Sequence, residues 1–261
     1  MSAPIERHNN GGVLTVVNNN PTSRNAISPE FYQGFRDVLE EANADNSMRA
    51  IVLAGAGNFF CSGGNVNGLK ERSESDISVR RSSISKLHAM IRAMRACRKP
   101  IIAAVEGGAS GAGVALALGC DMVIAARGAY LSVAYVRIGL TPDGGTTALL
   151  GHVIPRQLLA EMVMTGDRID VQRFHVMGVI NQIVEPGTAR DAAEALAKRL
   201  ADGPANAIAN GKRLVTLAHE VTLDQQLDQE AELIAQALGS DEGREGIAAF
   251  LEKRKPDFSK L

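Results

Sequence analysis

Residues 101–114 have the sequence IIAAVEGGASGAGV, an apolar run that breaks into glycine, alanine and serine before the apolar pattern resumes. The run is typical of a buried strand, and the segment after the glycines has the composition of a helix. The first turn of a helix leaves backbone N–H donors without partners inside the helix, and glycine and alanine leave room for a ligand oxygen to approach them. The stretch therefore predicts a strand, a tight turn and a helix, with an anion or oxyanion site at their junction.

Composition limits what the chain can be. Its 261 residues can bury a substantial core, and 45% hydrophobic with 22% charged residues is ordinary for a globular protein. The formal net charge of −1 gives no general attraction to nucleic acid or to an anionic membrane surface. No apolar stretch approaches the roughly 20 residues that span a bilayer, and residues 1–8 lack the apolar centre of a signal peptide. We therefore expect a cytoplasmic protein with no nucleic-acid or membrane partner.

Cysteine and histidine have neither a disulfide nor a metal-binding pattern. Cys61, Cys97 and Cys120 are odd in number and scattered, which favours buried or free thiols in a reducing compartment. Neither these cysteines nor the five histidines have the spacing of a zinc motif. The sequence predicts no structural metal.

Strand-like and helix-like segments alternate through most of the chain. A helix is expected to begin at Ser28, with Pro29 in its first turn, and another is expected over residues 76–98. Strands bounded by turn residues are expected at residues 13–17, 50–54, 101–105, 121–126 and 130–133. This order predicts an α/β fold with parallel strand pairing.

From about Thr188 onward the pattern is nearly all helical. Segments rich in alanine and leucine, separated by glycine or proline, are expected at residues 192–200, 204–217, 223–238 and 241–253. No linker long or polar enough to make them independent precedes them. We divide the chain into an α/β core that carries the ligand site, residues 1–187, and a helical C-terminal region, residues 188–261.

Several motifs in the same order resemble a known family. Residues 60–66, FCSGGNV, resemble the loop F-[SC]-[AS]-G-x-[DN]-[LIV] of the crotonase superfamily, the enoyl-CoA hydratases and isomerases. Residues 100–113 and the following CDMVIA at 120–125 resemble the central strand, loop, helix and strand of that family. The match is completed, collinearly over nearly the whole chain, by IGLTPDGGT at 138–146, MTGD at 164–167 and EGREGIAAFLEKR at 242–254.

The resemblance implies a fold, an assembly and a substrate. The fold is a crotonase-like spiral of repeated ββα units with a helical C-terminal trimerisation region, in a homotrimer or a dimer of trimers. The substrate is an acyl-CoA thioester, so coenzyme A is part of the substrate and no separate cofactor is expected. By the same resemblance, the thioester oxygen lies between two backbone N–H groups, which fall at Gly64 and Ala112. An enolate or thioester oxyanion requires two such preorganised donors.

Two glutamates of the resembling hydratases are missing here. Those enzymes carry one glutamate in the central helix and another after the following strand, because adding water to a double bond needs a base for water and an acid for carbon. Ala115 and Tyr135 occupy these positions. Asp143 remains, at a position where single-carboxylate enoyl-CoA isomerases and epoxyphenylacetyl-CoA isomerases resemble this chain. We expect Asp143 to move a proton between two carbons of an enoyl-CoA while Gly64 and Ala112 hold the dienolate oxygen.

The resemblance also assigns residues to binding the acyl-CoA. Two loops would hold the nucleotide, largely through backbone groups, and the C-terminal helix would contribute from the same subunit or a neighbouring one. The substrate-binding residues expected in this way are Arg24, Asn25, Ala26, Ser62, Gly63, Asn65, Val66, Gly111, Tyr135, Phe250 and Lys253.

The same residues allow structural interpretations. Asp143 lies in the sequence TPDGG, where aspartate is also a good turn residue. Gly111 and Gly113 would also permit close packing of the helix on a strand. Tyr135 has the properties of an ordinary pocket-wall residue.

Three other functions stay open at this point. Ser110 in GASGA resembles the nucleophile elbow of a serine hydrolase except at its last residue, and three histidines could act as its base: His152, His175 and His219. A hydratase could use Asp143 with a water molecule. A non-catalytic acyl-CoA-binding protein would follow from the two missing glutamates.

Overall fold

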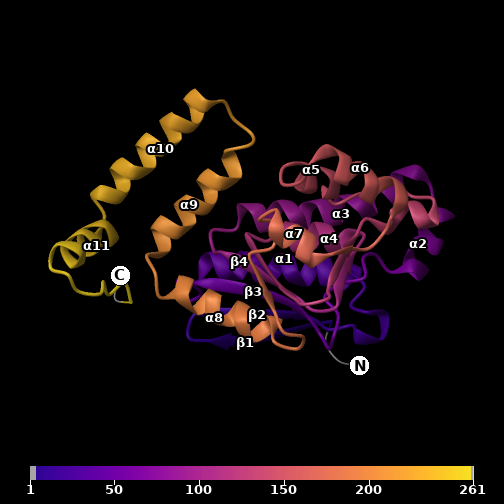
Figure 1. The fold of residues 1–261 in the computed structure, drawn as a ribbon, viewed down its shortest axis with the longest axis horizontal. Helices are drawn as coiled ribbons and strands as arrows, with labels where there is room; N and C mark the ends of the chain where they lie inside the picture. The colour runs from indigo at the N-terminus through magenta and orange to yellow at the C-terminus, as the bar shows by residue number, and fades with distance from the viewer. Residues whose placement is uncertain (1–3, 260) are drawn as a thin grey trace.

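The protein is built on a sheet of six strands in the order β1-β2-β3-β4-β6-β9 (Figure 1). The computed structural model describes residues 4–259 and 261. The six strands are β1 Ile5–Asn10, β2 Val13–Asn18, β3 Ala50–Gly55, β4 Ile101–Val105, β6 Met122–Ala126 and β9 Gln182–Val184. The apolar strands β2, β3 and β4 are buried almost throughout, as is typical of parallel strands covered on both faces.

Strand pairing follows the prediction except at the edges. β2, β3, β4, β6 and β9 pair in parallel, whereas β1 pairs antiparallel with β2. Gly11 and Gly12 connect these two strands with φ angles of 57° and 85°, which a tight hairpin turn requires. The sequence did not predict β1 because its side chains are mostly exposed and polar and therefore have no apolar pattern.

A second, three-stranded sheet carries the chain into the central glycine-rich loop. Its strands are β5 Gly108–Ser110, β7 Tyr130–Ser132 and β8 Ile169–Asp170. β5 and β7 are parallel, and β7 and β8 are antiparallel, which is a second departure from the predicted parallel pairing. The end of β5 places Gly111 directly after the sheet.

Helices cover both faces of the main sheet. α1 Pro29–Ala44 and α3 Ile77–Ala96 pack on one face, and α8 Ala189–Ala201 packs on the other. α1 begins as predicted, because the Ser28 hydroxyl accepts a hydrogen bond from the Phe31 N–H. α8 contacts the sheet with alanines at every fourth position, Ala189, Ala193, Ala197 and Ala201, all buried.

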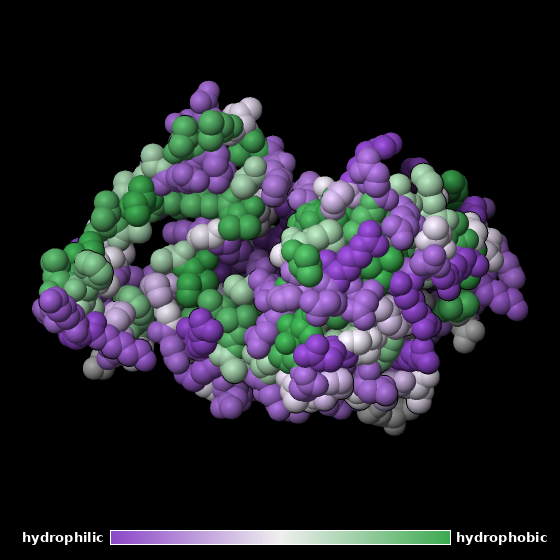
Figure 2. All heavy atoms as spheres, in the orientation of Figure 1, coloured by the Kyte–Doolittle hydropathy of each residue, from purple (hydrophilic) through white to green (hydrophobic). Residues whose placement is uncertain are grey.

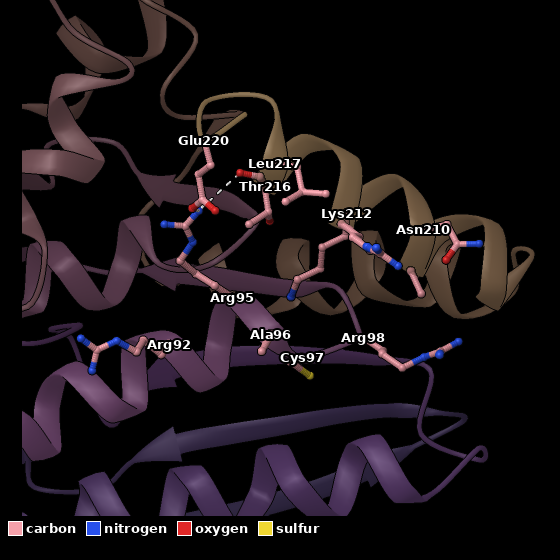
Figure 3. A pocket seen from close by; sticks show the side chains of 12 residues that line it. Arg92, Arg95, Ala96, Cys97, Arg98, Asn210, Lys212, Thr216, Leu217 and Glu220 are labelled. Carbon is pink, nitrogen blue, oxygen red and sulfur yellow. Dashed lines mark hydrogen bonds and ion pairs between the residues drawn. The ribbon is translucent and has the colours of Figure 1, made fainter. Parts of the chain in front are cut away.

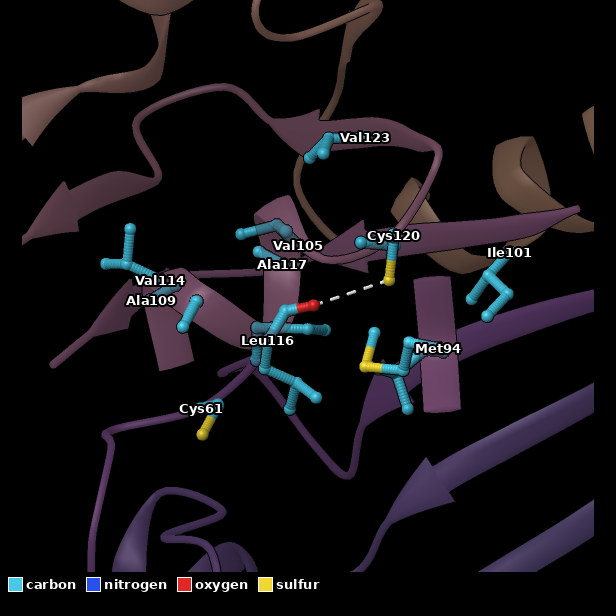
Figure 4. Packing of buried hydrophobic residues seen from close by; sticks show 14 of the residues in the cluster. Cys61, Met94, Ile101, Val105, Ala109, Val114, Leu116, Ala117, Cys120 and Val123 are labelled. Atoms are coloured by element: carbon cyan, nitrogen blue, oxygen red, sulfur yellow. Dashed lines mark hydrogen bonds between the residues drawn. The ribbon is translucent and has the colours of Figure 1, made fainter. Parts of the chain in front are cut away.

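Shorter elements complete the core. They are η1 Pro21–Ser23, α2 Val66–Ser73, α4 Ala112–Leu118, η2 Ala134–Ile138, α5 Thr146–Gly151, α6 Arg156–Thr165 and α7 Val171–Val176. α4 lies in the apolar core, where Leu116 and Cys120 pack near Met94 and the Cys120 thiol donates to the Leu116 carbonyl at 3.4 Å (Figure 4). The three cysteines are free and buried.

The last three helices form an arm that extends from the core (Figure 1). They are α9 Ala205–Leu217, α10 Leu223–Leu238 and α11 Asp241–Leu251, close to their predicted ranges. The arm begins after α8, because α8 packs on the sheet. The sequence-based division at residue 188 had placed α8 in the helical C-terminal region. Apolar side chains lie on the arm surface (Figure 2), among them Leu227 (52% exposed), Ile234 (59%) and Phe250 (83%).

The described residues show neither a membrane-spanning helix nor a metal-binding cluster. No helix among residues 4–259 is long and apolar enough to cross a membrane. Over the same part of the chain, no three His, Cys, Asp or Glu side chains form a group that could hold a metal ion.

Candidate active site

Two glycine-rich loops meet at the carboxyl ends of neighbouring parallel strands β3 and β4. The Ser110 N–H donates to the Cys61 carbonyl at 2.9 Å, and Cys61 forms a parallel bridge with Ala109. A Cβ added to Gly63 would lie 2.7 Å from the Ser110 carbonyl oxygen and 3.4 Å from the amide nitrogen of Ala112. The backbone of residues 62–64 therefore lies directly against the start of α4.

The Gly64 N–H points into open space beside α4. The Gly63 carbonyl accepts a hydrogen bond from the Ile27 N–H at 2.7 Å. In a planar trans peptide the carbonyl and the next N–H point in opposite directions, so the Gly64 N–H points away from Ile27. A Cβ on Gly64 would have no atom within 4 Å. This amide donates no hydrogen bond to any of the described residues.

The Ala112 N–H is the second free donor. Ala112 is the first residue of α4, and the preceding Gly111 carbonyl accepts from the Val114 N–H at 3.0 Å. The same peptide geometry makes the Ala112 N–H point away from the helix. Within the described part of the chain it has no acceptor. The two donors predicted from the sequence, the N–H groups of Gly64 and Ala112, are thus unpaired among the described residues and lie on loops that touch. An oxyanion between them could accept a hydrogen bond from both.

Gly63→Ala will test the contact between the two loops. Gly63 has a φ of 97°, and its added Cβ would overlap the Ser110 carbonyl. We expect a loss of at least about 1–2 kcal/mol in the free energy of unfolding, measured with urea. Gly64→Ala is the matched control, because a Cβ there meets nothing. Equal stability of the two variants would contradict this description.

Asp143 lies between η2 and α5, and its position is fixed by local hydrogen bonds. The Asp143 carbonyl accepts from the Thr146 N–H at 3.1 Å and from the Thr146 hydroxyl at 2.7 Å. Its Oδ1 accepts from the Tyr135 hydroxyl at 2.7 Å. Asp143 is therefore a turn residue, as its sequence context predicted, and also presents a half-buried carboxylate.

The Asp143 loop packs against the start of α4. A Cβ on Gly144 would lie 3.0 Å from the Ala115 Cβ and 3.1 Å from Leu87 Cδ2, so the small side chain at position 115 allows this approach. A Cβ on Gly111 would lie 3.8 Å from Cζ of Tyr135. The carboxylate and its phenol partner thus lie beside the loop that carries the Ala112 donor.

Two tyrosines near Asp143 stay protonated. Burial, followed by the negative charge of Asp143, raises the pKa of Tyr32 to about 12. The same two causes, in the same order, raise the pKa of Tyr135 well above its usual range. Tyr32 on α1 was not predicted as a site residue, because it lies next to an apolar helix face and no motif marks it.

The first binding loop makes mostly internal contacts. Asn25 is fully buried, and its side-chain amide donates to the carbonyls of Ala56 and Phe59 at 2.8 and 2.6 Å. The backbone of Arg24 accepts from the Ser62 N–H, and Ala26 is buried. The Arg24 guanidinium is exposed and lies 5.5 Å from the centre of the Phe59 ring. Asn25 and the Arg24 carbonyl therefore connect this loop to residues 56–62, and of the three predicted residues only Arg24 has a side chain open to a ligand.

The second binding loop is more open. The Ser62 hydroxyl donates to the Ser23 carbonyl at 2.8 Å, while Asn65 is half-buried and Val66 is 66% exposed. The backbone groups of residues 64–66 therefore border the open space in front of the Gly64 N–H.

Phe250 and Lys253 are not brought to this site within one chain. Phe250 lies on α11, at the far end of the arm from α4, and Lys253 follows it with a positive φ of 55° (Figure 1).

The three histidines predicted as a possible base for Ser110 make other contacts. His152 and His219 stack on each other with ring centres 4.9 Å apart, and Nδ1 of His175 lies 2.8 Å from the Ile180 carbonyl oxygen. No hydrogen bond joins Ser110 to a histidine in the described part of the chain. The hydrolase interpretation therefore lacks its catalytic base.

Two cavities are lined by residues other than Asp143. One of about 670 Å³ lies between the end of α3 and α9, and a second of about 430 Å³ adjoins it. The first is lined with cations (Figure 3), but Arg95 pairs with Glu220 at 2.6 Å, and Lys212 pairs with Asp121 at 2.8 Å. These cavities lie between α9 and the core, which the two ion pairs join.

Comparison with known proteins decides the family. The family model described as enoyl-CoA hydratase/isomerase matches residues 8–260. The chain belongs to the enoyl-CoA hydratase/isomerase family. It is 35% identical to 1,2-epoxyphenylacetyl-CoA isomerase of Escherichia coli K12, over 98% of both chains, and 32% identical to 2,3-dehydroadipyl-CoA hydratase of the same organism, over 94% of both.

A solved structure agrees with this assignment. An enoyl-CoA hydratase from Polaromonas sp. JS666 is 40% identical and superimposes with a TM-score of 0.95, covering 97% of this chain and 98% of that one. The predicted family and the predicted α/β crotonase fold are therefore confirmed. The protein is an acyl-CoA-processing enzyme of the enoyl-CoA hydratase/isomerase family.

Proposed function

We propose that the protein is an enoyl-CoA isomerase that uses Asp143 as its single proton-transferring group. The observation that carries the proposal is the half-buried Asp143 carboxylate beside the two free amides, at a site where Ala115 and Tyr135 replace the expected glutamates. One relative, 35% identical, is named an isomerase and another, 32% identical, a hydratase, so the choice between the two reactions rests on the residues of the site.

The proposed reaction needs one carboxylate and two donors. Asp143 removes a proton from C2 of a 3-enoyl-CoA, and the C–H electron pair moves into the dienolate, whose oxygen accepts from the Gly64 and Ala112 N–H groups. The protonated carboxyl then returns the proton to C4, which leaves the double bond conjugated with the thioester. Proton balance is complete within the substrate and Asp143, so the mechanism requires no cofactor beyond the coenzyme A of the substrate.

The test uses trans-3-hexenoyl-CoA and crotonyl-CoA with the purified protein. An isomerase increases the absorbance of the conjugated enoyl thioester from the first substrate. Loss of crotonyl-CoA absorbance without isomerisation would instead support a hydratase that uses Asp143 and water, and inactivity on both would support a non-catalytic acyl-CoA-binding protein.

We further propose that the arm assembles the protein as a homotrimer or a dimer of trimers. Leu227 and Ile234 are seven residues apart on one face of α10 and are more than half exposed in the single chain. Packing of this face on a neighbouring subunit would bury them. It would also allow Phe250 and Lys253 of one subunit to reach the acyl-CoA of another.

Leu227→Glu combined with Ile234→Glu is expected to convert the oligomer into monomers in sedimentation velocity, because two carboxylates would then be buried in an apolar interface. Asp228→Lys is the control, since it changes charge at an exposed, already polar position of the same helix. An unchanged sedimentation coefficient in the double variant would exclude this face as the interface.

A further inference from the structure

Tyr135 contacts both parts of the candidate site. Its hydroxyl donates to Oδ1 of Asp143 at 2.7 Å. Its ring lies against the oxyanion loop, since a Cβ on Gly111 would be 3.8 Å from Cζ and 3.9 Å from Cε2 of Tyr135. The Leu140 N–H donates to the Tyr135 carbonyl at 3.0 Å, which holds η2 against the segment that leads to Asp143. The phenol therefore joins the carboxylate to the loop that carries the Ala112 donor.

The two carboxylate oxygens of Asp143 are not equivalent. Oδ1 has the Tyr135 hydroxyl as its donor, whereas Oδ2 accepts no hydrogen bond from the described residues. Thr146 fixes the Asp143 backbone through its N–H and its hydroxyl. With the backbone and one oxygen fixed, the direction of the other oxygen is also fixed.

The Tyr135 phenol stays protonated at this site. Burial, the charge of Asp143 and the direct hydrogen bond all raise the pKa of its phenol, which remains protonated across the working range of an enzyme. A neutral phenol with a high pKa does not remove a proton from carbon. Its contribution is geometric, through the carboxylate.

We infer that Tyr135 is a positioning residue, which holds Oδ1 of Asp143 so that Oδ2 removes the substrate proton and returns it. In the first half-reaction an Oδ2–H bond forms and the C2–H bond breaks; in the second, the Oδ2–H bond breaks and a C4–H bond forms. The Tyr135 proton stays on the phenol throughout. The inference rests on the proposed isomerase function of Asp143, and it replaces the sequence-based assignment of Tyr135 to substrate binding.

Tyr135→Phe removes the hydroxyl and keeps the ring. We expect kcat for trans-3-hexenoyl-CoA to fall about 10–100-fold, because displacing a catalytic group by about 1 Å lowers the rate by up to about that factor. KM should change less than about threefold. A carboxylate that is free to turn also exchanges its proton with solvent more often. In D₂O, the deuterium incorporated per molecule of isomerised product, measured by mass spectrometry at low conversion, should therefore rise in the variant. This ratio does not depend on how much of the enzyme is folded.

Tyr130→Phe is the matched control. Tyr130 lies on the adjacent strand β7, where its ring packs 4.5 Å from the Arg168 guanidinium and edge-on to Phe59. Removal of this second phenol hydroxyl should leave kcat, KM and the deuterium ratio unchanged.

Four results would contradict the inference or the function on which it rests. A Tyr135→Phe enzyme with kcat within twofold of the parent would overturn the inference. A raised KM with unchanged kcat would also overturn it and return Tyr135 to substrate binding. Full activity in Asp143→Asn would refute the proposed function itself, whereas an inactive Asp143→Asn beside a fully active Tyr135→Phe would refute only the role of Tyr135.

Discussion

Asp143→Asn is expected to lower kcat for isomerisation of trans-3-hexenoyl-CoA by about 10²–10⁴-fold, the usual contribution of a positioned general base. Asparagine keeps the size of the side chain and an acceptor for the Tyr135 hydroxyl, but it cannot hold the transferred proton. Asp143 is only half-buried and its backbone bonds to Thr146 do not involve the side chain. Folding should therefore be preserved, and the absorbance of the conjugated thioester measures the loss.

The control for this variant is Asp167→Asn. Asp167 is an exposed carboxylate in the same part of the fold and pairs with Arg137 at 2.7 Å. Its replacement should leave kcat within about twofold, since an exposed pair contributes little. An Asp143→Asn enzyme that keeps a tenth or more of the parent activity, free of contaminating isomerase, would show that another group moves the proton.

The layered fold could be predicted from the sequence because its buried elements have clear patterns. β2, β3 and β4 are apolar runs closed by turn residues, and the helical arm has alanine and leucine segments punctuated by glycine and proline. β1 was missed because an exposed edge strand carries no apolar pattern. α2 was missed for the same reason, since none of its described side chains is buried.

The site could be predicted only in part. Gly64 and Ala112 lie in loops that follow adjacent parallel strands, so their meeting follows from the strand order. The hydrogen bond between Tyr135 and Asp143 could not be predicted. It depends on how the chain after η2 turns back to bring Asp143, eight residues further on, to the Tyr135 hydroxyl. Asn25 shows the opposite difficulty. As a polar residue in a loop assigned by resemblance to ligand binding, it was predicted to contact the substrate, but its buried side-chain amide donates to the carbonyls of Ala56 and Phe59.

Ala112→Pro is expected to have the second large effect, a decrease in kcat of about 10²–10³-fold, because it removes one oxyanion donor. Direct removal of a backbone N–H is possible here because Ala112 is the first residue of α4. A helix tolerates proline at that position, since the first N–H has no partner inside the helix. The Ala112 N–H has no acceptor among the described residues, so the loss should fall on the reaction and not on the helix.

Ala112→Gly separates the donor from the side chain. It removes the buried methyl group but keeps the N–H, so it should retain most of the activity that Ala112→Pro loses. Thermal unfolding of both variants, with urea titration as a second measure, shows whether α4 is intact. If a folded Ala112→Pro enzyme turned over at the parent rate, the Ala112 N–H would not be an oxyanion donor. The dienolate oxygen would then have to be bound by other groups. If instead kcat falls and KM is unchanged, the donor acts on the transition state in preference to the bound substrate, as an oxyanion site must.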